Sequence, residues 1–74
     1  MAKKGNDTVY RVTEVIGTSA TSWEDAASNA VAAAAKTLRD LRIAEVSELD
    51  MQIEDGKVVA YRAKVQVSYK YDGE

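Results

Sequence analysis

Three carboxylates in the second half of the chain, Glu45, Glu48 and Asp50, are the residues whose type and spacing best suit chemistry. On a regular β-strand, Glu48 and Asp50 project to the same side, about 6–7 Å apart. Carboxylate oxygens bind hard cations such as Ca²⁺, at about 2.3–2.6 Å. At that spacing, two carboxylates need further ligands from another subunit, from backbone carbonyls or from water. We predict Glu48 and Asp50 as candidate metal ligands, beside the alternative that both are solvated strand residues.

The composition excludes most catalytic chemistry. The chain contains no His and no Cys, which removes the usual zinc, copper and haem ligands, His-based acid–base catalysis and disulfide bonds. No nucleophile stands beside a base, and the segment around Gly56 lacks the ligand spacing of an EF-hand calcium loop. We therefore expect that the protein is not an enzyme.

Charge and hydropathy narrow the range of partners. The net charge is −2, with 30% charged residues of mixed sign, so no electrostatic pattern favours nucleic acid or an anionic membrane surface. No apolar run approaches the ~20 residues that cross a bilayer, and no signal-peptide pattern is present. We expect a cytoplasmic protein without nucleic-acid or membrane partners.

The elements that must position the carboxylates are arranged around one helix, which we predict over residues 21–41. Thr21 or Ser22 can cap its start, since acidic residues follow three positions later. The segment Gly17–Ser19 before it is expected to end the preceding strand. Trp23 is predicted to anchor a core or an interface rather than to hold a ligand. The predicted apolar stripe of the helix consists of Trp23, Ala27, Ala30, Ala34, Leu38 and Leu41.

Segments rich in β-branched and aromatic residues predict three β-strands, of which the last alternates clearly with a period of two and the first alternates imperfectly, since Val15 and Ile16 are both apolar. The strands cover residues 8–16, 42–55 and 57–71. The apolar parity of the second strand changes at Ser47-Glu48, which predicts a β-bulge or a bend. The alternative is that this stretch forms two separate short strands.

The chain is predicted to be one small domain that ends in a hairpin. Asp55-Gly56 is a typical turn signal between the last two strands, so the element order is β-α-β-β. We expect one domain over residues 8–71, with flexible tails at residues 1–7 and 72–74. Because 74 residues bury only a modest core and no disulfide supports it, we expect a homo-oligomer to stabilise the fold.

Sequence phrases along most of the chain resemble the dodecins. The phrases are VYRVTEVIGTSATSWEDA, KTLRDLRIAEV, IEDG and YRAKVQVSYK, and the resemblance extends from about residue 8 to residue 73. It implies an α+β subunit of β-α-β-β order, with a three-stranded antiparallel sheet wrapped around one helix. It also implies a hollow homododecamer, since dodecins assemble in this way, and most of them store flavins.

Two replacements separate this chain from the flavin-binding dodecins. Where typical members carry a stacking Trp, this chain has Ile43, and where they carry a Gln that hydrogen-bonds the flavin ring, it has Arg62. Glu45 is the predicted ion-pair partner of Arg62. Ile43, Glu45 and Arg62 therefore mark the positions of the former flavin pocket. We expect no flavin pair there, because a branched alkyl group has no flat π face and a guanidinium has no acceptor.

The same phrases resemble a subgroup of dodecins that lacks this Trp and is described as calcium-binding. Glu48 also falls at a position where a family member carries a divalent-metal ligand. The resemblance implies a storage cage for small ligands or ions, with calcium as the expected cation. Two alternatives remain open, namely flavin binding in a remodelled pocket and a structural assembly without any ligand.

Overall fold

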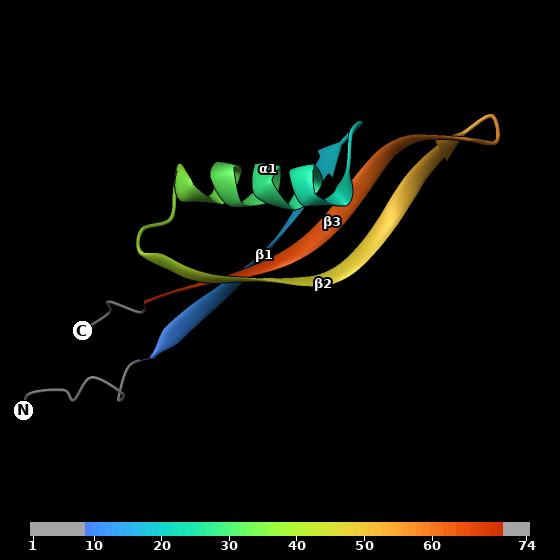
Figure 1. The fold of residues 1–74 in the computed structure, drawn as a ribbon. Helices are drawn as coiled ribbons and strands as arrows, with labels where there is room; N and C mark the ends of the chain where they lie inside the picture. Colours follow the sequence, from blue (N-terminus) through green and yellow to red (C-terminus); the bar gives the residue numbers. More distant parts are fainter. Residues whose placement is uncertain (1–8, 71–74) are drawn as a thin grey trace, which may run out of the picture.

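A computed structural model of the chain describes residues 9–70, which form one helix and three strands (Figure 1). The predicted α+β fold is confirmed, while the predicted tails, residues 1–7 and 72–74, lie outside the described residues. The elements follow the predicted β-α-β-β order and are β1 (Tyr10–Ser19), α1 (Trp23–Ala35), β2 (Leu41–Glu54) and β3 (Lys57–Lys70).

The three strands form one antiparallel sheet in the order β1-β3-β2, so β3 is its central strand. The alternation along β3 suits this position, because Ala63, Val65 and Val67 are buried beneath α1 while polar residues stand between them. The sheet therefore has one face covered by the helix and one face turned away from it, here termed the outer face. Figure 1 shows α1 lying along the sheet, with the β2–β3 hairpin extending past the start of the helix.

Helix α1 begins at the predicted cap and ends earlier than predicted. The Ser22 side chain accepts a hydrogen bond from the Asp25 backbone N–H at 3.0 Å. The helix ends at Ala35 because the chain must turn back to start β2, and Asp40 makes part of this turn with a φ of 60°. The prediction of a helix over residues 21–41 is therefore wrong at its C-terminal end. Among the described residues, no helix is long and apolar enough to cross a membrane.

The core between α1 and the sheet is built mostly from alanine. The predicted stripe is correct at Ala30 and Ala34, which are buried, and its members Ala27, Leu38 and Leu41 are partly buried against this core, whereas Ala26 is buried without having been predicted. Small side chains let the helix approach the sheet closely, and no side chain larger than valine is fully buried within residues 9–70. The core residues are Ala26, Ala30, Ala34, Ala63, Val65 and Val67.

Gly17 marks a close approach between α1 and β1. It lies within β1, opposite Ala63 of β3. A Cβ at this position would lie 2.0 Å from the Ala26 carbonyl oxygen and 2.9 Å from the Ala30 Cβ. The prediction that Gly17–Ser19 ends the strand is wrong, because this glycine makes room for the helix backbone and the strand continues through it.

A tight turn and a bulge set the register of β2 on β3. The turn is at Asp55-Gly56, as predicted, and both residues have positive φ, at 52° and 75°. The register shifts between Val46 and Glu48, which confirms the predicted bulge at Ser47. Because β2 is one continuous strand, the alternative of two short strands is wrong. The bulge lets apolar residues on both sides of it face α1, while the carboxylates face outward.

Candidate cation site

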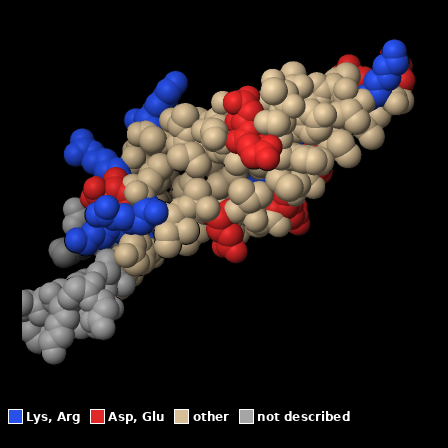
Figure 2. Space-filling model, viewed as in Figure 1, with Lys and Arg blue, Asp and Glu red and all other residues tan. Residues whose placement is uncertain are grey.

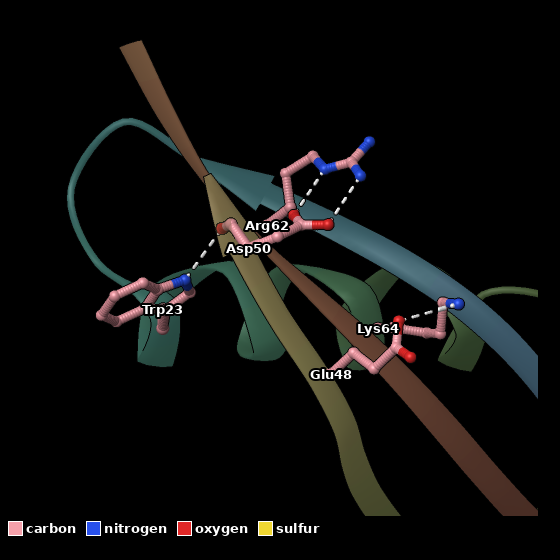
Figure 3. A network of polar contacts seen from close by, with 5 residues as sticks. All are labelled: Trp23, Glu48, Asp50, Arg62 and Lys64. Atoms are coloured by element: carbon pink, nitrogen blue, oxygen red, sulfur yellow. Dashed lines mark hydrogen bonds and ion pairs between the residues drawn. The ribbon is translucent and has the colours of Figure 1, made fainter. Parts of the chain in front are cut away.

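Two carboxylates of β2 and two cations of β3 form neighbouring pairs on the outer face (Figure 3). Glu48 is paired with Lys64, and Asp50 is paired with Arg62. Opposed residues of antiparallel strands point to the same face, so all four side chains project from the outer face. These four residues are termed the charge ladder. The prediction that Glu48 and Asp50 point to one side is confirmed.

Asp50 and Arg62 form a two-pronged ion pair. Arg62 Nε donates to one carboxylate oxygen of Asp50 at 2.7 Å, and Nη2 donates to the other at 2.8 Å. The two side chains are about half exposed, at 51% and 43%, so dissolved ions can reach them. The prediction that Glu45 pairs with Arg62 is wrong, because the register places Glu45 opposite Gln66.

Glu48 and Lys64 form the second pair of the charge ladder. Lys64 Nζ lies 3.1 Å from a carboxylate oxygen of Glu48. Ser47, at the bulge, donates a hydrogen bond from its hydroxyl to the Lys64 carbonyl oxygen at 3.2 Å, which ties the bulge to β3. Each carboxylate of the ladder is therefore matched by a cation from the same sheet.

The ion pairs shift the pKa values of the groups that form them. The hydrogen bond from Arg62 is the main reason that the pKa of Asp50 lies below its ordinary value of 3.8. The hydrogen bond that Arg62 donates to the Asp50 carboxylate raises the pKa of Arg62 in turn. The hydrogen bond to Glu48 likewise raises the pKa of Lys64. All three pKa shifts favour the charged forms of Asp50, Arg62 and Lys64.

Acid should weaken the fold through the Asp50–Arg62 pair. Since the folded state lowers the pKa of Asp50, the pair contributes stability above the ordinary pKa of 3.8, and this contribution is lost as the pH falls through the lowered value. Urea unfolding of the wild type and of Asp50→Asn, measured between pH 7 and pH 2, checks this. We expect the wild type to be more stable at pH 7 and the difference to shrink only below about pH 4. A difference that stays constant down to pH 2 would contradict the assignment.

Trp23 connects the start of α1 to the charge ladder through the backbone. Its indole Nε1–H donates to the Asp50 carbonyl oxygen at 3.0 Å (Figure 3). Its ring also meets the Tyr61 ring edge-on, with centroids 5.1 Å apart. Asp50 is thus held by its carbonyl from one side and by its carboxylate from the other. This placement agrees with the prediction that Trp23 anchors the structure.

The positions of the former flavin pocket do not come together within one chain. Ile43 is 62% exposed and pairs with Ser68, whose hydroxyl donates to the Ile43 carbonyl oxygen at 3.4 Å. Arg62 lies six residues from Ser68 along β3, about 20 Å away at the rise of an extended strand. Glu45 lies between them on the same outer face. A pocket that used both Ile43 and Arg62 would need a second copy of the chain.

The carboxylates suit calcium in kind but are too few in one chain. Glu48 and Asp50 offer hard oxygen donors, which calcium prefers. Calcium takes six to eight oxygen ligands, whereas residues 9–70 contain no group of three or more acidic, His or Cys side chains placed to hold a metal. Both carboxylates also already contact a cation of β3. Any calcium site here would therefore need oxygen ligands in addition to these two carboxylates.

An apolar groove runs between α1 and β2 on the helix-covered face. It consists of three adjoining hollows of about 400, 320 and 160 Å³ that share lining residues. Figure 2 shows uncharged atoms over much of the middle of this side of the molecule, with several Asp and Glu patches among them, while Lys and Arg gather mainly toward one end. The sequence analysis missed the groove, although the apolar parity of β2 was its signal. The residues that define this α1–β2 groove are Ala27, Val31, Ala44, Val46 and Leu49.

Comparisons with known proteins agree with the fold and with the sequence phrases. The family model described as Dodecin matches residues 9–72. A relative named calcium dodecin, from Mycobacterium tuberculosis, is 47% identical over 62 residues, which cover 84% of this chain and 87% of the relative.

Solved structures give the same result. The structure of dodecin from Streptomyces coelicolor matches with a TM-score of 0.85 and 38% identity, covering 93% of this chain and 99% of that one. The crystal structure of the calcium dodecin from M. tuberculosis, described as having a novel calcium-binding site, matches with a TM-score of 0.78 and 46% identity, covering 90% and 96%. The chain therefore belongs to the dodecin family.

Proposed function

We propose that the protein is a homododecameric cage of the dodecin type that binds calcium rather than flavin. Dodecins are homo-oligomeric proteins that bind small ligands, which supports the coarser part of this proposal. The observation that carries the calcium part is the pair of carboxylates, Glu48 and Asp50, presented side by side on the outer face of β2. The name of the relative that is 47% identical supports the same cation.

The small core of the subunit supports an assembled state. No side chain larger than valine is fully buried within residues 9–70, while many large apolar side chains are exposed. In the α1–β2 groove, Val46 is 46% exposed and Leu49 is 52% exposed. Apolar surface of this extent is usually covered by a partner in a stable protein. A second copy of the chain is the partner that the family indicates.

The calcium ion would take oxygen ligands from Glu48 and Asp50, and other oxygens would complete its shell. Ligands from a neighbouring subunit, backbone carbonyls and water are the available sources. Binding would stabilise the assembled state, because the ion links groups that a single chain does not bring together.

Two side chains argue against the alternative of a flavin in a remodelled pocket. Ile43 offers a branched alkyl group where stacking needs a flat aromatic surface. Arg62 has only donors, and two of them are already bonded to Asp50. A flavin would therefore lose both its stacking platform and its complementary hydrogen bonds at these positions.

Calorimetric titration of calcium into chelator-treated protein tests the proposal. We expect the double variant Glu48→Gln/Asp50→Asn to bind calcium at least about tenfold more weakly than the wild type, because two charged ligands are lost. Glu54→Gln, at the end of β2 and outside the charge ladder, is the matched control and should bind like the wild type. Equal affinity in the wild type and the double variant would contradict the proposed ligands, and light scattering should give the mass of a dodecamer of the 8.1 kDa chain.

A further inference from the structure

We infer that Arg62 and Lys64 are built-in competitors for the cation, which hold the Asp50 and Glu48 carboxylates in the calcium-free protein and are displaced when calcium binds. This inference rests on the proposed calcium site and adds to it the residues that set its affinity. In the calcium-free protein, the side chains of Arg62 and Lys64 therefore occupy the place at the two carboxylates that calcium would take.

The geometry of the Asp50–Arg62 pair leaves little room for a second cation. Both carboxylate oxygens are taken by the two N–H groups of one planar guanidinium, at 2.7 and 2.8 Å. A calcium ion bound to the same carboxylate would lie 2.3–2.6 Å from its oxygens. The ion and the guanidinium would then be close neighbours of like charge. Calcium binding by both Asp50 oxygens, in the place that the guanidinium occupies, therefore requires Arg62 to move.

Arg62 and Lys64 compete strongly with calcium because β3 holds them beside the carboxylates, and their exposure to solvent lets calcium displace them reversibly. Arg62 and Lys64 stand two residues apart on one strand, as their partners Asp50 and Glu48 do on the other, so the register fixes one cation per carboxylate. A group held beside its partner by the fold acts at a high effective concentration. The Asp50 and Arg62 side chains are nevertheless about half exposed, so their ion pair can open into solvent without unfolding the sheet.

Trp23 provides a readout of this displacement that is independent of calorimetry. It is the only tryptophan in the sequence. Its indole N–H donates to the carbonyl oxygen of Asp50, the residue whose carboxylate holds Arg62. A movement of Asp50 toward a bound ion would change the environment of the indole. Calcium should therefore change the tryptophan fluorescence in proportion to the calorimetric binding.

The test compares calcium binding by Arg62→Gln and by Lys57→Gln. Both variants remove one positive charge from β3, but Lys57 lies at the hairpin, outside the charge ladder. We expect Arg62→Gln to bind calcium about fivefold to tenfold more tightly than Lys57→Gln, because a charge next to a divalent ion has been removed. Arg62→Lys, which keeps the charge without the two-pronged contact, should have an intermediate affinity. Circular dichroism establishes that each variant is folded.

The outcomes separate this inference from the proposed function. If the wild type binds calcium and Arg62→Gln agrees with Lys57→Gln within twofold, the competition is wrong and the calcium function stands. If only Arg62→Gln binds, and adding Asp50→Asn abolishes that binding, the competition is right and calcium is not the ligand of the natural protein. If neither binds, both ideas are wrong. Tighter binding by Arg62→Gln than by a wild type that also binds supports both.

Discussion

Replacing Gly17 with alanine should destabilise the subunit by about 3 kcal/mol or more, or prevent it from folding. The added Cβ would lie 2.0 Å from the Ala26 carbonyl oxygen and 2.9 Å from the Ala30 Cβ. Neither neighbour is the flexible end of a side chain, so relief requires α1 to shift as a whole. Such a shift would open the contact between the helix alanines and β3 that forms the core.

Urea unfolding followed by circular dichroism measures this effect, with Gly56→Ala as the control. Gly56 has a φ of 75° and nothing within 4 Å of the position of an added Cβ, so its replacement adds backbone strain without a clash. That strain costs about 1–2 kcal/mol. Both variants are compared at equal protein concentration, because the stability of an oligomer depends on it. If Gly17→Ala were no less stable than Gly56→Ala, the close contact of α1 and β1 would be wrong.

The types of the elements and their order could be predicted from the sequence because the residue patterns of the strands and the helix differ in period. β3 shows this most clearly, since its alternation over residues 57–70 directly gives the buried set of Ala63, Val65 and Val67. Gly17 was misread because an isolated glycine gives the same local signal whether it ends a strand or admits another backbone. Only the position of α1 above β1 decides between the two.

The candidate site was predictable in its carboxylates but not in their partners. A period of two places Glu48 and Asp50 on one face, whatever lies opposite. Counting outward from the turn, with Glu54 opposite Lys57, would put Asp50 opposite Tyr61, but the register shift between Gln52 and Ile53 brings Arg62 there instead. Irregularities of this kind depend on packing, and a shift of one residue exchanges an aromatic partner for a cation.

A second shift, at the bulge, restores the simple count and determines the place of Glu45. After the extra residue Ser47, the pairing returns to Val46 opposite Val65 and Glu45 opposite Gln66. The predicted ion pair between Glu45 and Arg62 is wrong in either register, because the simple count places Glu45 opposite Gln66 and the shifted count would place it opposite Val67. The same bulge creates the α1–β2 groove, since it turns Val46 and Leu49 to the same face of the sheet although their numbers differ in parity.

Replacing Val46 with aspartate should break the proposed dodecamer into smaller species. Val46 lines two of the three hollows of the α1–β2 groove and is 46% exposed in the single chain. If a second copy covers the groove, the new carboxylate would be buried without a partner, which costs about 3–5 kcal/mol for each contact. A closed assembly repeats the contact at every subunit. The loss is therefore multiplied, and we expect dissociation rather than a modest weakening.

Light scattering at micromolar concentration measures the result, with Ala33→Asp as the control. Ala33 is exposed on α1 and does not line the groove. Its replacement therefore adds the same negative charge to the subunit but places it outside the apolar groove. We expect this control to keep the mass of the wild type. An unchanged mass for Val46→Asp would mean that the groove stays open to solvent in the assembly. The exposed side chains elsewhere, such as Val12 and Ile16 of β1, would then have to supply the contacts between subunits.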